Sequence, residues 1–246
     1  MKLLVYDVEL SDMDILIKSY DLKNRIRWFN HENIIRDWTM LGASWKHLDD
    51  DKISCVSISP KDPLNDYAVI QKLYKAIEAS DGLIGHNADN FDLKKFNTRA
   101  IYYGMPPLQK KIQTDTLKIA RKYFKFTSNS LRYIANYLGL ENKGDSPDWD
   151  AVMSGDRKEI ALMREYNRQD VIVTEQLYKK LRGWHHTHPD VSSVTRDIEG
   201  KEMDKCPSCD SVNVVKNGHK PKVKAGVVYK FAQVLLCRNC GRNFLR

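Results

Sequence analysis

The sequence lacks the features that mark membrane-spanning, fibrous and disordered proteins. No apolar run approaches the roughly 20 residues that cross a bilayer, and neither a low-complexity tract nor an internal repeat is present. Only Lys2 precedes the first apolar run, which contains acids, so we expect no signal peptide, a cytoplasmic protein and no membrane partner. With 42% hydrophobic and 29% charged residues, the composition is that of a soluble globular chain.

Cysteine is nearly missing before residue 206. Four of the five cysteines lie in the tail, and we expect the fifth, Cys55, to be a buried strand residue. Positive charge is concentrated in the tail as well. Residues 201–246 carry ten Lys or Arg against three Asp or Glu, whereas residues 1–200 carry thirty against twenty-nine. This asymmetry predicts a separate C-terminal unit with a polyanionic partner.

Hydrophobic periodicity predicts one α/β domain with a mixed sheet flanked by helices. Alternation predicts strands within residues 2–10, 14–18, 40–45 and 52–59, the last three forming an antiparallel half of the sheet, and a short strand within 82–87. Helical spacing predicts helices within residues 63–80, 91–103, 116–124 and 156–181, with another ending near 138. Periodicity stops at Gly183, so we predict a domain over 1–182, a linker over 183–205 and a small module over 206–246.

Two acids interrupt the apolar first strand. Asp7 and Glu9 are two residues apart, so their side chains project from the same face of the strand. Burying unpaired carboxylates costs several kcal/mol, which favours a cation held in common. The alternative is that the strand ends near Val5 and both acids are solvated.

Further acids follow later elements. Tyr166 and Asp170 are four residues apart in a predicted helix and share one of its faces, although many surface helices carry such a pair. Asp89 and Asp92 follow the short strand, and either could reach a site at its end. Apolar residues on both sides of Asp92 indicate that it begins a packed helix, whereas Asp89 is expected to face water.

In their order along the chain, these segments resemble a known family. Val5–Glu9, Gly85–Asp92 and Tyr166–Asp170 resemble the three motifs of the DEDD superfamily of 3′-to-5′ exonucleases, in its tyrosine-bearing branch. The resemblance covers about residues 1–182 and extends to Asp115–Lys118, Asn129–Arg132 and Tyr137–Leu140. The histidine branch requires His where this chain has Glu165. Leu10 departs from the family, in which Thr or Ser is common at that position.

The resemblance implies a ribonuclease H-like fold and a set of metal ligands. Asp7, Glu9, Asp92 and Asp170 would hold two Mg²⁺ or Mn²⁺ ions about 3.5 to 4 Å apart. Asp7 would bridge both ions, Glu9 and Asp170 would hold the ion that activates water, and Asp92 would hold the other. Tyr166 would orient the attacking water. A phenol is a poor base at neutral pH, so the ion would do most of the acidification of that water. A site made only of oxygen ligands suits hard cations such as Mg²⁺ and Mn²⁺ better than it suits Zn²⁺.

For the candidate substrate contacts, the sequence leaves two alternatives open in each case. Asn87 either contacts substrate or braces its turn, and Phe91 either stacks on a base or packs in the core. Arg121, Lys122 and Lys125 either line the path of the strand or form a solvated helix face.

The tail contains two Cys-x2-Cys motifs. Cys206, Cys209, Cys237 and Cys240 have the spacing of one structural Zn²⁺ in a zinc ribbon, with strands predicted over 212–216 and 227–236. Disulfides are the alternative, which a cytoplasmic setting disfavours. The ribbon is expected to bind nucleic acid, although docking to a protein remains an alternative. The expected contacts are Lys216, Lys220, Lys222, Lys224, Lys230, Arg238 and Arg242, with Tyr229 and Phe231 available for stacking.

The predicted activity is metal-dependent 3′-to-5′ exonuclease cleavage that releases nucleoside 5′-monophosphates. Single-stranded 3′ ends of DNA are favoured over RNA as substrate, and a DNA polymerase or replication complex is a candidate partner. One alternative is a transposon-type endonuclease, a class that combines a related core with a zinc ribbon but lacks the Tyr166 and Asp170 pair. The other is a proofreading or accessory nucleic-acid-binding subunit with little activity alone.

Overall fold

The structure is a computed structural model that describes residues 2–18, 30–140, 144–185, 195–196, 202–224 and 227–245. Side chains are described for these residues except 195–196, 202–203, 222–224 and 227–230. Most of the predicted linker over 183–205 lies outside the described residues, including two of its three histidines. So do the side chains of four predicted contacts of the ribbon, namely Lys222, Lys224, Tyr229 and Lys230.

A five-stranded mixed sheet forms the centre of the larger unit, in the order β5-β4-β1-β6-β7. The strands β1 (Leu3–Leu10), β4 (Met40–His47) and β5 (Ser54–Ser57) pair antiparallel, whereas β6 (Gly82–Gly85) and β7 (Ile112–Asp115) continue the sheet in parallel from β1. The predicted mixed α/β architecture is therefore confirmed. β1 lies in the middle because its apolar residues are buried on both faces, as expected for a central strand.

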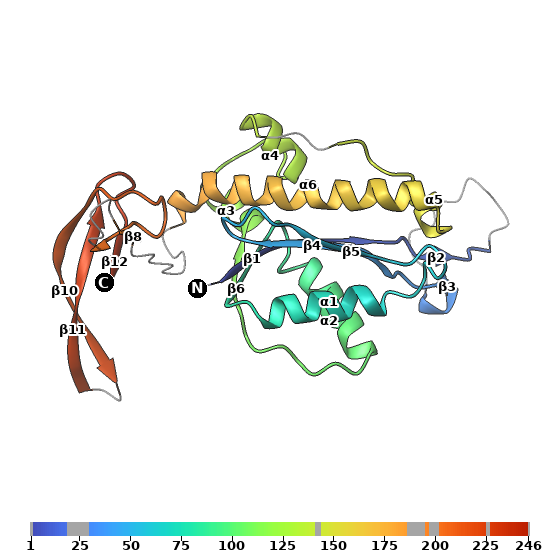
Figure 1. Cartoon of the computed structure of the whole chain (residues 1–246), viewed down its shortest axis with the longest axis horizontal. Coiled ribbons are helices and arrows are strands. Elements are labelled where there is room, and N and C mark those ends of the chain that lie inside the picture. Colours follow the sequence, from blue (N-terminus) through green and yellow to red (C-terminus); the bar gives the residue numbers. More distant parts are fainter. Residues whose placement is uncertain are drawn as a thin grey trace.

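Helices cover both faces of this sheet (Figure 1). One face is covered by α1 (Tyr67–Glu78) and α2 (Asp92–Tyr102), and the other by the long α6 (Arg157–Leu181). Alternate residues of β1 pack against the helices on opposite faces of the sheet. Leu4 and Tyr6 belong to the cluster that includes α1 and α2, whereas Val5 packs with Val171 and Tyr178 of α6. The remaining helices of this unit are α3 (Thr116–Tyr123), α4 (Leu131–Tyr137) and α5 (Trp149–Met153).

The buried stripe of α6 contains polar residues among its apolar ones. Ile160, Met163, Val171, Val173, Leu177 and Leu181 recur at helical spacing and pack inward. Asn167, Asp170, Thr174 and Glu175 lie on the same buried side, each no more than 5% exposed. Burial of unpaired polar groups is costly, so this part of α6 must face polar partners on the sheet.

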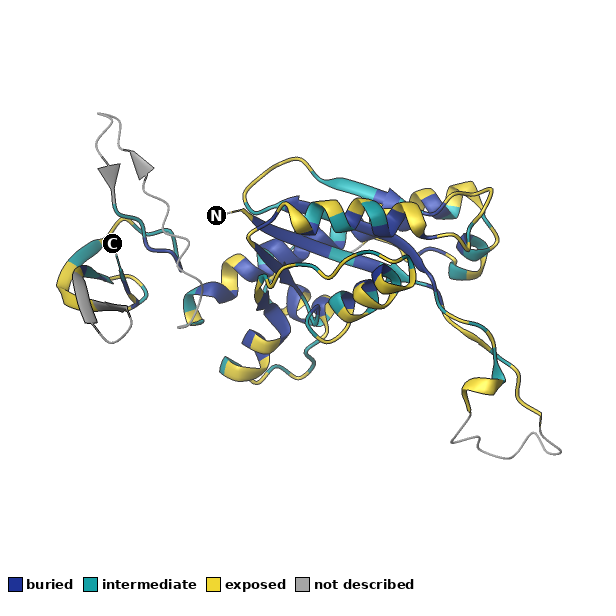
Figure 2. Ribbon diagram, turned by 90° about the horizontal axis from the view of Figure 1, so that it is seen from below, coloured by how far each residue is buried: buried dark blue, intermediate teal, exposed yellow. Residues whose placement is uncertain are grey.

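The predicted strands differ from the observed ones in two places. Residues 14–18 contribute only β2 (Asp14–Ile15), which pairs with β3 (Ile34–Arg36) after the short 3-10 helix η1 (His31–Asn33) and does not join the main sheet. This pair projects from the sheet as an arm whose surface is largely exposed (Figure 2). The edge strand β7 was not predicted, because Ile112–Asp115 has little apolar alternation. Cys55 is only partly buried in β5, contrary to expectation.

The C-terminal unit is a three-stranded antiparallel sheet beyond the end of α6 (Figure 1). Its strands are β10 (Val214–Lys224), β11 (Val227–Cys237) and β12 (Asn243–Leu245). A 3-10 helix η2 (Arg182–Trp184) follows α6, and two short strands β8 (Thr195–Arg196) and β9 (Glu202–Met203) pair with each other. The side chain of Arg182, at the end of α6, forms an ion pair with Asp210 beside the cysteine cluster.

Candidate active site

Asp7 and Glu9 point from β1 toward α6. The residues directly opposite them on β4 are Ser44 and Gly42, and directly opposed residues of an antiparallel pair share a face. A side chain at Gly42 would meet the end of Met163 of α6, which identifies this face as the one covered by α6. The small residues on β4 therefore leave room for two carboxylates between the sheet and the helix.

Asp170 on α6 completes a cluster of three acids. Asp7, Glu9 and Asp170 each offer a carboxylate oxygen, and these oxygens all lie within 4.8 Å of one another. Asp7 and Glu9 are half-buried, and Asp170 is buried. The segments that carry these residues are more than 150 positions apart in the chain, and the packing of α6 on β1 brings them together. The alternative in which Asp7 and Glu9 lie past the end of the strand is wrong, because β1 continues to Leu10.

Asn167 also belongs to this cluster, a position that no pattern in the sequence predicted. Its Nδ2 donates to Asp7 Oδ2 at 2.8 Å and reaches Glu9 Oε1 at 3.4 Å. Asn167 is only 1% exposed, and it lies one helical turn before Asp170 on the buried side of α6. An amide that donates to two carboxylates reduces their mutual repulsion and fixes their orientation.

Asp92 lies beside this cluster and is not one of the three acids within 4.8 Å. β6 pairs with β1 only as far as Val5, so the backbone N–H of Val8 has no strand partner on that side. Asp92 Oδ1 accepts this N–H at 3.3 Å. Burial raises the pKa of Asp92 to about 7, and the charge of Asp115 adds to the increase, while the backbone N–H groups of Asp92 and Val8 oppose it. A cation would favour the ionised form.

The turn between β6 and α2 is braced by the carboxylate of Asp115. Its carboxylate caps α3 by accepting the N–H of Leu117 at 2.9 Å, and it also accepts the N–H of Asn87 at 2.9 Å and of Asp89 at 3.3 Å. Asn87 has a φ of 65°, in the left-handed region. A carboxylate buried at the end of β7 therefore fixes the loop that leads to Asp92.

The other predicted site residues have distinct surroundings. Tyr166 is half-buried, one turn before Asp170, and its ring meets that of Trp149 edge-on at 6.2 Å. Phe91 is 45% exposed, so the alternative of a core position is wrong. Asp89 is half-buried and forms an ion pair with Lys118, so the expectation that it faces water is also wrong.

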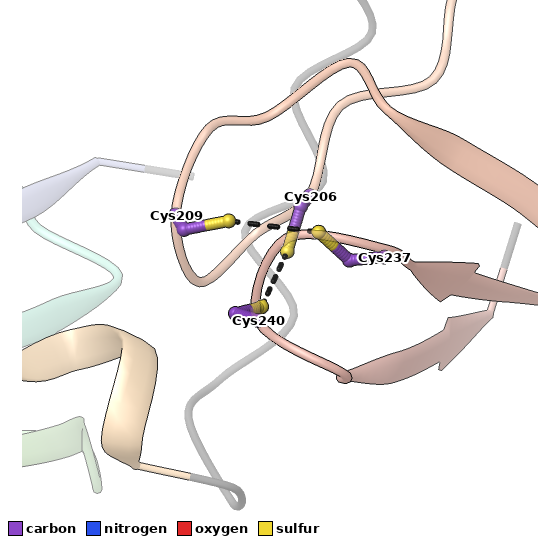
Figure 3. Close-up of side chains that lie close together, drawn as sticks. All are labelled: Cys206, Cys209, Cys237 and Cys240. Atoms are coloured by element: carbon purple, nitrogen blue, oxygen red, sulfur yellow. Dashed lines mark hydrogen bonds between the residues drawn. The ribbon is translucent and has the colours of Figure 1, made fainter.

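The four tail cysteines form a second cluster (Figure 3). Sγ of Cys206 lies 3.6 Å from Sγ of Cys240, and Sγ of Cys209 lies 3.6 Å from Sγ of Cys237. A disulfide needs about 2.05 Å, whereas tetrahedral Zn²⁺ with bonds of about 2.3 Å places its sulfurs about 3.8 Å apart. The arrangement therefore fits zinc. Burial opposes ionisation of the Cys237 thiol, but backbone N–H groups of Cys240 and Asn239 lower its pKa to about 7.

The acidic cluster in turn fits hard divalent cations. All of its ligand atoms are oxygens, at a separation that a shared ion would bridge. Two further buried oxygens, Ser44 Oγ and Asn167 Oδ1, accept or donate no hydrogen bond among the described residues. Ser44 lies directly opposite Asp7. Orphaned buried oxygens beside carboxylates are expected where ordered water or a hydrated ion belongs.

Comparison with known proteins gives the family. The sequence model of the RNase H superfamily matches residues 35–182, more than half of the chain. The chain belongs to the RNase H superfamily. No curated protein matches it in sequence. Among solved structures, it is similar to the family B DNA polymerase from the hyperthermophilic archaeon Pyrobaculum calidifontis, with a TM-score of 0.55 and 18% identity. The similarity covers 75% of this chain and 25% of that chain, and shows a shared fold.

The RNase H superfamily match covers only part of the chain. It begins at residue 35, so β1 with Asp7 and Glu9 lies before it, and the cysteine cluster lies after it. The structure nevertheless makes β1 the central strand of the RNase H-like sheet. In the described part of the chain, no helix has both the length and the apolarity that crossing a bilayer requires.

Among the described side chains of the C-terminal unit, three of the predicted basic contacts are exposed and one is buried. Lys216, Lys220 and Arg238 are exposed, and Phe231 is 62% exposed. Arg242 is buried and donates to Ser208 Oγ, so its prediction as a phosphate contact is wrong. Its guanidinium instead supports the loop that carries Cys206 and Cys209.

Proposed function

We propose that the protein is a two-metal-ion 3′-to-5′ exonuclease of the tyrosine-bearing DEDD branch. It removes nucleotides from single-stranded 3′ ends, with DNA favoured over RNA, and releases nucleoside 5′-monophosphates. Residues 1–182 form the nuclease domain, 183–205 a linker and 206–246 a zinc ribbon that assists binding of nucleic acid. The cluster of Asp7, Glu9 and Asp170, with carboxylate oxygens within 4.8 Å, is the observation that carries the proposal.

Two findings support a nuclease. Membership of the RNase H superfamily supports metal-dependent cleavage of nucleic acid by this fold. The fold shared with a DNA polymerase supports a role on DNA. Fold alone does not determine chemistry, so the proposal depends on the carboxylates.

The residues of the site have different roles in the proposed reaction. Asp7, Glu9 and Asp170 would bind the cations, and Asp92, at the start of α2, would add the fourth carboxylate. Tyr166 holds the attacking water by hydrogen bonding, since a phenol is too weak a base to deprotonate it at neutral pH. When bound, two Mg²⁺ or Mn²⁺ ions would supply activation of water and stabilisation of the leaving 3′ oxygen.

Contacts beyond the acids position the substrate. Asn87 and Phe91 precede Asp92, and the exposed ring of Phe91 is available to stack on a base. In the zinc ribbon, Lys216, Lys220 and Phe231 present charge and an aromatic face to the same kind of ligand. The four cysteines would hold one structural Zn²⁺, without which a unit of this size buries too little surface to fold.

The test is a digest of end-labelled single-stranded DNA and RNA with Mg²⁺ or Mn²⁺. We expect Asp7→Ala and Asp170→Asn to reduce nucleotide release by at least about a hundredfold, with circular dichroism unchanged. Asp51→Ala removes an exposed acid outside the cluster and serves as the matched control. Undiminished release by either cluster variant would end the proposal.

The substrate ends separate the alternatives. A transposon-type endonuclease would degrade circular or 3′-blocked DNA, whereas a 3′-to-5′ exonuclease leaves both intact. An accessory subunit would bind the strand but release no nucleotide unless a polymerase is added. A 3′-labelled strand should lose its label at once, while a 5′-labelled strand should give a ladder.

A further inference from the structure

Lys95 lies beside the predicted active site and takes no part in the chemistry described above. It is three residues after Asp92 on α2, so the two side chains lie on one side of that helix. Its ammonium is 3.8 Å from the ring centroid of Trp38 and 5.9 Å from that of Phe91. Trp38 precedes β4, at the base of the projecting arm formed by β2 and β3. Two aromatic rings from distant segments therefore hold one lysine next to the loop that leads to Asp92.

Lys95 differs from other lysines of this unit, whose ammonium groups have polar partners. The half-buried Lys111 donates to the backbone carbonyls of Glu78 and Ser80. Lys46 and Lys179 form ion pairs with Glu175, and the ammonium of Lys118 is paired with Asp89. Within the described ranges, no carboxylate lies within ion-pair distance of Lys95. Burial lowers the pKa of Lys95, and the charge of Asp37, whose carboxylate accepts the N–H of Trp38, partly opposes this. The fold thus places a cation without a carboxylate at ion-pair distance where water is partly excluded, at a cost that an anionic ligand would offset.

We propose that Lys95 binds a backbone phosphate of the nucleic-acid strand close to the acidic cluster, and that Trp38 positions its ammonium through a cation–π contact. The inference rests on the proposed nuclease function and adds a specific phosphate subsite to it. A phosphate fits an ammonium that has no carboxylate partner. The exposed Phe91 ring, 5.9 Å from the same ammonium, is placed for the base of the neighbouring nucleotide.

A purely structural role makes a different prediction. In that case the Lys95 contact with Trp38 only fastens the base of the arm to α2, and its loss would weaken binding without regard to any particular phosphate. The two roles are therefore separated by neutralising phosphates of the ligand one at a time. A methylphosphonate removes the charge of one phosphate and leaves the rest of the strand intact.

The experiment measures binding of fluorescent single-stranded DNA to the full chain by anisotropy, in an Asp7→Ala background so that the strand is not degraded. Lys95→Gln should weaken binding about tenfold. It should also reduce the salt dependence, the slope of log K against log salt, by about 0.7. One methylphosphonate near the 3′ end should weaken binding by the parent and leave binding by Lys95→Gln unchanged. Lys94→Gln removes an adjacent exposed charge and should behave like the parent.

Trp38 is tested through its dependence on Lys95. Trp38→Leu should weaken binding by the parent but have no further effect when combined with Lys95→Gln. The inference is overturned if Lys95→Gln matches Lys94→Gln, or if every methylphosphonate weakens Lys95→Gln as much as the parent. If the parent binds no strand, or if Asp7→Ala still degrades it, the proposed nuclease function fails instead.

Discussion

Asn167 donates its side-chain amide to Asp7 across the interface between α6 and β1, with Nδ2 2.8 Å from Oδ2. The same nitrogen lies 3.4 Å from Glu9 Oε1. The amide therefore sits between two carboxylates that would otherwise repel each other in a site partly sheltered from water. This contact ties the helix carrying Tyr166 and Asp170 to the strand carrying the other two acids.

Removing this amide should loosen the cation site. We expect Asn167→Ala to raise the Mg²⁺ concentration needed for half-maximal activity about 10- to 100-fold, because residues that orient metal ligands have effects of this size. Asn167→Asp keeps the shape but replaces the donor with an acceptor, so it should also impair the site. The measurement is a Mg²⁺ titration of nucleotide release, with Lys180→Gln on the exposed side of α6 as control. Unchanged Mg²⁺ dependence of Asn167→Ala would refute a positioning role.

Asp92 should make the metal-free protein less stable as pH rises. Its pKa is about 7 when folded and near the ordinary carboxyl value of about 4 when unfolded. Between these values the folded state holds the proton more tightly, so its contribution to the free energy of unfolding falls as pH rises through this window and is lost above it. The full effect is on the order of a few kcal/mol.

Chemical denaturation in chelator from pH 4 to 8 tests this expectation. Asp92→Asn retains an oxygen for the Val8 N–H but cannot ionise. The free energy of unfolding of this variant should therefore fall less than that of the wild type as pH rises. Adding Mg²⁺ should flatten the wild-type curve, because a cation favours the carboxylate. Parallel pH curves for the two proteins would rule out the assigned pKa.

Zinc should be needed by the C-terminal unit and not by the RNase H-like unit. We expect one zinc per chain by elemental analysis, and loss of that zinc in Cys206→Ser. The variant should retain the main unfolding transition, since the sheet and α6 have their own core, but should bind single-stranded DNA more weakly. Cys55→Ser, which changes the one cysteine outside the cluster, is the matched control. Full zinc content in Cys206→Ser would contradict the site.

Glu175 should stabilise the packing of α6 on β4. Burial raises its pKa, but hydrogen bonds from Lys46, the Asp49 backbone and Lys179 outweigh burial and leave the pKa below its ordinary value. Its contribution is thus present above the ordinary carboxyl pKa and is lost as pH falls through the lower folded value. Glu175→Gln leaves the buried Lys46 ammonium without a counter-charge and should cost about 3 kcal/mol at neutral pH.

Urea denaturation at pH 7 and at acid pH measures this cost. The difference between wild type and Glu175→Gln should shrink at acid pH. Glu165→Gln, on the same helix but with a side chain 72% exposed, should change stability little. Equal stability of the Glu175 and Glu165 variants would show that the buried pair contributes nothing.

The elements with strong periodicity were predictable. β1, β4, α1, α2 and α6 follow from apolar spacing, because burial of one face or of both faces dictates where apolar residues recur. β7 and the separate β2–β3 arm were not predictable in this way. Their residues alternate weakly, and strand pairing is decided by contacts with segments distant in the sequence.

The sequence by itself determined the ligand chemistry: two acids on one face of a strand, a Tyr and an Asp one turn apart on a helix, and four cysteines with zinc spacing. Side-chain type and local period suffice for that. Only the tertiary structure decided which groups meet, since the packing of α6 on β1 brings Asn167 to Asp7, and the early divergence of β6 from β1 leaves the Val8 N–H for Asp92. Contacts of this kind depend on how layers pack, and no local pattern in the chain encodes them.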